Sequence, residues 1–137
     1  MRSWLLMGML GLVMMFAGAN VVSAQDVLPC KCPEGTIYVG DDVACKFEVC
    51  IKDSEGFHCI TVGPGSVELF KCHDQAVIFL KDCNGNLVQI NNNKDNCVRC
   101  VCVGFGKGCC AVDACVGYDR NGCLYVKIVP SPCRIVC

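Results

Sequence analysis

The sequence predicts a small, all-β fold that is held together by disulfides. Sixteen of its 137 residues are cysteines, a density typical of disulfide scaffolds and far above that of ordinary globular domains. Short runs of β-branched and aromatic residues alternate with turn residues along the chain. Beyond the N-terminus, no stretch repeats apolar residues at helical spacing for three turns, so helices are not expected.

The N-terminus has the pattern of a secretory signal peptide. Arg2 gives a positive start, and residues 4–16 contain no charge. Val22-Ser23-Ala24 then supplies the small or short side chains that signal peptidase accepts, so we expect residues 1–24 to be removed and the protein to be secreted. The apolar run is shorter than the roughly 20 residues that cross a bilayer, which argues against a membrane anchor.

Eight short strands are expected in the remaining chain, and turn residues separate them. Asn84-Gly85 is the clearest turn, because both residues tolerate the positive φ of a type I′ turn. Residues 77–81 and 87–90 are therefore expected to form a hairpin around it. The full set of expected strands is 36–39, 44–49, 58–62, 67–72, 77–81, 87–90, 98–103 and 124–129.

The cysteines gather in one part of the chain, since residues 95–119 carry six of them as C-x2-C-x-C-x6-C-C-x4-C. In the oxidising environment that a signal peptide implies, an even number of cysteines favours complete pairing in eight bridges. A zinc site is disfavoured because Cys97 and Cys100 have no second pair at zinc-finger spacing. A thioredoxin-type redox site lacks its β-α-β context. We therefore expect structural disulfides, no metal and no cofactor.

Charge narrows the possible partners. Twelve basic residues stand against thirteen acidic ones, for a net charge of −1, and the charges form no basic block. Nucleic acids and anionic membranes are bound by concentrated Lys and Arg. Neither a nucleic acid nor a membrane is therefore expected as a partner.

Few side chains are arranged for catalysis. Gly65-Ser66-Val67 lacks the second glycine of a nucleophile elbow. In Cys72-His73-Asp74, neighbouring side chains on a strand would point to opposite faces. No nucleophile is visibly paired with a base, so we expect no enzyme activity and no catalytic residue. His73 is expected to face the solvent beside a half-cystine.

A longer motif indicates a family. In order, the chain contains Gly85-Asn86, Asp95-Asn96-Cys97-x2-Cys100-x-Cys102, Cys109-Cys110 and Val116-Gly117-Tyr118-Asp119-x3-Cys123. This combination resembles the β-microseminoprotein family of small secreted proteins over residues 72–137. Von Willebrand type C modules are the alternative; they share C-x2-C-x-C but lack V-G-Y-D after a vicinal cysteine pair.

The resemblance implies a Greek-key sheet followed by short two-stranded ribbons. In this chain, that domain would follow a cysteine-rich extension at residues 25–71. The resemblance also implies the bridges Cys83–Cys102, Cys97–Cys133, Cys100–Cys109 and Cys123–Cys137, with Cys110 bonded to Cys72 or Cys59.

Cys115 has no counterpart in the family pattern. If Cys72 bonds to Cys110, the cysteines left over are Cys115 and the five of the extension, Cys30, Cys32, Cys45, Cys50 and Cys59. Because five is odd, we expect Cys115 to bridge to one of them and to join the extension covalently to the rest. The competing expectation is that Cys115 bonds within residues 72–137 and displaces a family cysteine such as Cys137.

Three function classes fit a durable secreted protein of this composition. The resemblance implies a non-enzymatic binding protein that docks on another secreted protein, such as a cysteine-rich secretory protein. An exposed sheet edge that pairs with a partner strand is the expected physical route, with Val126 in strand 124–129 as the first candidate. The alternatives are a structural component of an extracellular matrix or coat and a defence or venom polypeptide. The sequence does not set the oligomeric state.

Overall fold

The computed structural model describes residues 27–90, 96–133 and 137, which include all sixteen cysteines. The predicted signal peptide, residues 1–24, lies outside the described residues. The described chain consists of strands and turns, so the all-β, disulfide-rich class is confirmed, and it contains no helix able to span a membrane. The strands are β1 Leu28–Pro29, β2 Glu34–Val39, β3 Phe47–Asp53, β4 Gly56–Val62, β5 Val67–Lys71, β6 Gln75–Lys81, β7 Leu87–Gln89, β8 Cys97–Phe105, β9 Gly108–Tyr118 and β10 Leu124–Pro130.

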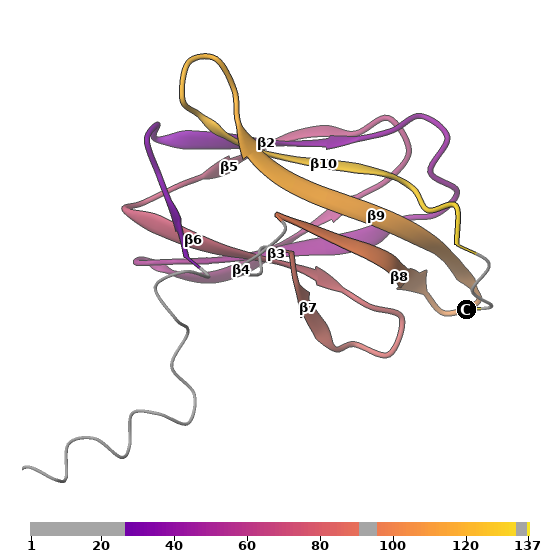
Figure 1. Ribbon diagram of the computed structural model, residues 1–137. Coiled ribbons are helices and arrows are strands. Elements are labelled where there is room, and N and C mark those ends of the chain that lie inside the picture. The colour runs from indigo at the N-terminus through magenta and orange to yellow at the C-terminus, as the bar shows by residue number, and fades with distance from the viewer. Residues whose placement is uncertain (1–26, 91–95, 134–136) are drawn as a thin grey trace, which may run out of the picture.

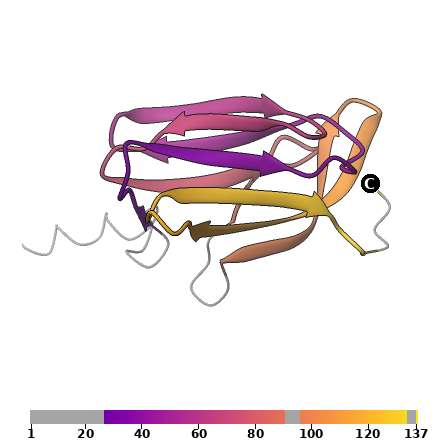
Figure 2. The ribbon, with the colours of Figure 1, turned by 90° about the horizontal axis from the view of Figure 1, so that it is seen from above.

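Within the described residues, the strands form two sheets of five strands each, which pack face to face (Figure 1). Sheet 1 has the order β1-β6-β3-β4, with β7 also paired to β6, and sheet 2 has the order β5-β2-β10-β9-β8. In Figure 2, the indigo strand β2 lies beside the yellow strand β10, and these two strands run parallel. Both sheets contain strands from residues 25–71 and strands from residues 72–137. The two predicted segments therefore share their sheets.

The core lies between the two sheets and follows the alternation of the strands. In β2, Ile37 points inward and is 0% exposed, while its neighbour Tyr38 is 44% exposed. This period of two is expected when one face of a sheet is buried and the other is wet. The largest fully buried side chains are Phe47, Ile37, Ile51, Ile78, Leu80, Ile90, Leu124, Ile128, Val49, Val62, Val103 and Val112.

The two sides of this sandwich differ. On one side, the turn after β6 reaches β8: Asp82 forms an isolated bridge with Val103, and the N–H of Cys83 donates to the carbonyl of Cys102 at 2.9 Å. On the other side, β4 and β5 end their sheets, and no described strand pairs with their outer edges. We call the first the closed side and the second the open side.

The prediction that residues 124–129 form an exposed sheet edge is wrong. β10 lies between β2 and β9, and Val126 pairs with Ile37 on one side and with Val116 on the other. Val126 is 0% exposed because it is at the centre of sheet 2. A partner strand therefore cannot reach it.

Seven disulfides connect the chain, and they fall into three groups. Three bridges join the first half of the chain to the second: Cys30–Cys72, Cys32–Cys123 and Cys45–Cys110. Two cross between paired strands: Cys50–Cys59 and Cys97–Cys115. Two fasten the C-terminal end to β8: Cys100–Cys133 and Cys102–Cys137. The thiols of Cys83 and Cys109 are free.

These pairs correct the expected connectivity. None of the bridges implied by the resemblance is present: Cys110 bonds to Cys45, Cys123 to Cys32, and Cys83 and Cys109 to nothing. Cys97, Cys100, Cys102, Cys133 and Cys137 are bonded, but to other partners than expected.

Strand register explains the correction for Cys115, which was expected to reach the extension. It lies directly opposite Cys97 in the β8–β9 pair, with the two Cα atoms 3.9 Å apart. The competing expectation, that Cys115 bonds within residues 72–137, is confirmed. The extension is nonetheless joined covalently, through Cys30, Cys32 and Cys45.

The expected hairpin of β6 and β7 is confirmed, with Leu80 opposite Val88, but its turn type is wrong. Only Gly85 has a positive φ, of 86°, whereas a type I′ turn also needs one at Asn84. The carboxylate of Asp82 instead accepts the N–H groups of Asn84 and Asn86 at 2.9 and 2.8 Å. The D-x-N-G turn that begins at Asp119 repeats this pattern, since its carboxylate accepts two N–H groups at 2.9 Å.

The seven-bridge arrangement predicts two reactive thiols. Iodoacetamide added to the denatured, unreduced protein should add two labels, at Cys83 and Cys109, as measured by intact mass and peptide mapping. Cys83 is exposed and Cys109 is half-buried, so under native conditions Cys83 should react first, and Cys83→Ser should remove the fast label. Full oxidation with no label at all, as the even cysteine count suggested, would contradict this arrangement.

Candidate functional site

The open side exposes the backbone of β5. The N–H of Cys72 donates to the carbonyl of Pro33 at 2.9 Å, at the end of the pairing of β5 with β2. Because backbone groups alternate in direction along an antiparallel strand, the even-numbered residues of β5 bond toward β2. The N–H and C=O groups of Val67, Leu69 and Lys71 therefore point away from the sheet, toward the open side.

The side chains of this edge are largely apolar. Val67 and Leu69 are 63% and 61% exposed. Val67 lies opposite Tyr38, whose ring meets that of Tyr125 edge-on at 6.4 Å, so the apolar surface continues over the outer face of sheet 2. Natural edges are blunted by charged side chains, proline or a bulge; β5 carries Glu68 and Lys71 but has no proline and no bulge.

The other strand of the open side, β4, extends past the edge of sheet 2. Ile60 lies opposite Val49 and His58 lies opposite Ile51. The two β3 residues are 0% exposed, whereas Ile60 is half-buried and His58 is exposed. On the same face of β4, Val62 is buried, so sheet 2 covers β3 and one end of β4 and leaves the other end less covered. We call this less covered part of the inward face of β4, carried by Ile60 and His58, the shelf.

A groove of about 280 Å³ lies at one end of the shelf. It contains an aromatic ring, since Phe57 is 51% exposed, together with side chains of both charges. The groove is lined by Asp53, Glu55, Gly56, Phe57, His58, Lys71 and His73.

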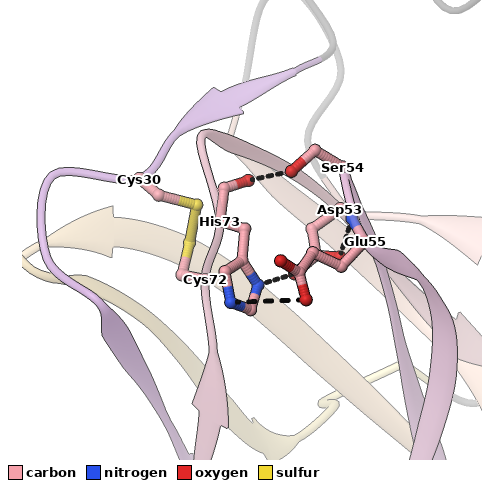
Figure 3. Close-up of polar contacts among 6 residues, drawn as sticks. All are labelled: Cys30, Asp53, Ser54, Glu55, Cys72 and His73. Carbon is pink, nitrogen blue, oxygen red and sulfur yellow. Dashed lines mark hydrogen bonds and ion pairs between the residues drawn. A yellow bond between two sulfur atoms is a disulfide. The ribbon is translucent and has the colours of Figure 1, made fainter.

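His73 forms a clasp with two carboxylates at the end of this groove (Figure 3). Its Nδ1–H donates to Oδ2 of Asp53 at 2.9 Å, and its Nε2 lies 3.7 Å from Oε1 of Glu55. The hydroxyl of Ser54 donates to the backbone carbonyl of His73 at 3.3 Å, and so is directed away from the imidazole ring. The clasp ties the β3–β4 turn to the connection between β5 and β6.

Neighbouring bonds hold His73 in position. Cys72, the residue before it, is bridged to Cys30, and the N–H of Cys30 donates to the carbonyl of Asp74 at 2.8 Å. Asp74 has a φ of 60°, which turns the chain sharply between β5 and β6. The histidine is therefore presented by a short, bonded connection.

The clasp favours the charged forms of both partners. Burial raises the pKa of Asp53, whose side chain is 3% exposed, but hydrogen bonds from His73 and from the N–H of Glu55 outweigh it and lower that pKa. The hydrogen bond to Asp53 raises the pKa of His73; partial burial and Lys71 oppose this rise, and the charge of Glu55 adds to it. The arrangement favours a proton on the imidazole between two carboxylates.

Linkage gives the clasp a definite pH window. His73 contributes stability below its ordinary pKa of 6.5, and this contribution is lost as pH rises through its raised pKa. Asp53 contributes stability above its ordinary pKa of 3.8, and this contribution is lost as pH falls through its lowered pKa. The clasp should therefore stabilise the fold most between these two values.

This window can be tested with His73→Gln. The variant should lose more unfolding free energy in urea near pH 5 than near pH 9, because the charged contact is present only at the lower pH. His58→Gln, at the exposed histidine in the same groove, is the matched control and should show no such difference. An equal loss for His73→Gln at both pH values would show that the ring charge does not stabilise the fold.

The sequence did not predict this site. It placed His73 beside a half-cystine, and the ring is 37% exposed, but its bonds to Asp53 and Glu55 were not predicted. Residues 53–56 lie between the expected strands 44–49 and 58–62, so a turn with no further role was expected there. The cysteines singled out from the sequence lie outside the groove, although Cys72 anchors its histidine.

Among the described residues, no group of three His, Cys, Asp or Glu side chains is placed to hold a metal ion. No protein-family model, curated protein or solved structure matches the chain. The resemblance to β-microseminoproteins thus stays a prediction. The open side and its groove are the features of the described structure that bear on function.

Proposed function

We propose that the protein is a secreted, non-enzymatic binding protein that docks on another extracellular protein through its open side. The observation that carries the proposal is the unpaired edge of β5, where Val67 and Leu69 are exposed. Such an edge is a template for a further strand, because its N–H and C=O groups are already aligned. Seven disulfides are compatible with an oxidising, extracellular environment.

The sequence resemblance supports the same class of function. β-Microseminoproteins are binding proteins, and the resemblance implies a secreted partner such as a cysteine-rich secretory protein. A matrix or coat component and a defence polypeptide are the alternatives. The apolar edge favours the binding protein, because exposed Val67 and Leu69 lie beside backbone groups that no described strand pairs with.

Leu69→Pro tests the proposal. The N–H of Leu69 points away from β2, so proline removes a bond to the partner and leaves the β2–β5 ladder intact. Tagged protein should capture a partner from its native extracellular fluid, and Leu69→Pro should lose that partner. Unchanged disulfides and amide exchange in the core would show that the variant is folded.

Two variants serve as controls for the capture. Leu69→Ala keeps the backbone donor and should retain most of the binding. Phe105→Ala removes a similarly exposed apolar side chain, 50% exposed, at the β8–β9 turn and should have no effect. A partner that binds Leu69→Pro as strongly as the unsubstituted protein would rule out docking on β5.

A further inference from the structure

One strand position in sheet 2 is empty on the open side. β5 directs the backbone groups of Val67, Leu69 and Lys71 outward, and the less covered shelf of β4 lies in the opposite sheet. A strand bonded to β5 would lie over β4. Its inward side chains would cover Ile60, whose equivalents on β3 are fully buried by the existing strands.

A second copy of this chain is a poor occupant of that position. Two β5 strands could pair only through residues 67, 69 and 71, so Lys71 would lie opposite one of these three and never opposite Glu68. A two-fold axis would also bring the projecting β4 strands of both copies into the same space. The position therefore suits a single extended segment from a different protein.

Charge defines one end of that segment. Lys71 is exposed, lies opposite Glu34 on β2, and forms no ion pair with any residue the structure describes. A carboxylate placed opposite Lys71 on an added strand would continue this row of alternating charge. Cross-strand pairs of opposite charge stabilise a sheet, and like charges destabilise it.

We propose that the partner donates an extended strand to sheet 2, with apolar residues at alternate positions facing the shelf and an acidic residue opposite Lys71. The inference rests on the proposed function and specifies the chemistry of the segment that docks. The added strand would bury Ile60 beneath it and leave its outward side chains beside Val67 and Leu69.

Two synthetic peptides provide the probe. The first is capped Asp-Val-Thr-Val-Thr-Val-Asp, in which the three valines face the shelf and an aspartate meets Lys71 whichever way the peptide runs. The second replaces both aspartates with lysine. Binding is followed on the ¹⁵N-labelled, oxidised protein by amide chemical shifts and hydrogen exchange.

The acidic peptide should protect the amides of Val67, Leu69 and Lys71 and should bind roughly two- to five-fold more tightly than the lysine peptide. Lys71→Glu should reverse this preference, and Lys71→Arg should keep it. Equal binding of both peptides, protection elsewhere on the protein, or no binding would overturn the inference. If the natural partner is still lost on Leu69→Pro in that case, the proposed function stands and only the strand chemistry falls.

Discussion

The parallel pairing of β2 with β10 joins the two halves of the chain, and the rest of the structure depends on it. Ile37 lies opposite Val126 and Val39 opposite Ile128, with all four side chains buried. Parallel strands cannot be joined by a tight turn, so all the chain between them must fold around the pair. The Cys32–Cys123 bridge lies at the start of both paired strands and closes a loop of 91 residues. By loop-closure entropy, such a bridge stabilises the folded state by roughly 4–5 kcal/mol.

This pairing also decides where the molecule can bind. Because β10 is at the centre of sheet 2, the edge strands of that sheet are β8 and β5. The turn after β6 contacts the outer edge of β8 through the bridge between Asp82 and Val103. β5 stays open, and the His73 clasp fixes the connection that follows it to the β3–β4 turn. The groove is therefore a consequence of strand order, and its charged end is set by the contact of Asp53 with His73, the residue after the bridged Cys72.

Local patterns in the sequence predicted local structure and little beyond it. Alternation located most strands, but β9 was missed because its glycines, alanines and cysteines are weak strand formers, although Val112, Ala114 and Val116 alternate inward. Disulfide partners and the Asp53–His73 contact depend on register between distant strands, which spacing along one chain does not encode. The edge was expected at apolar residues 124–129; the charges of Glu68 and Lys71 in β5 were the better indication.

Peptide mapping of the unreduced protein tests the shared-sheet arrangement most directly. Digestion without reduction, followed by mass spectrometry, should yield one linked peptide pair containing Cys32 with Cys123 and another containing Cys45 with Cys110. These bonds form only if the first half of the chain lies within the same two sheets as the second. A bond from Cys123 to Cys137, together with pairing of Cys32 and Cys45 inside residues 25–71, would contradict this account.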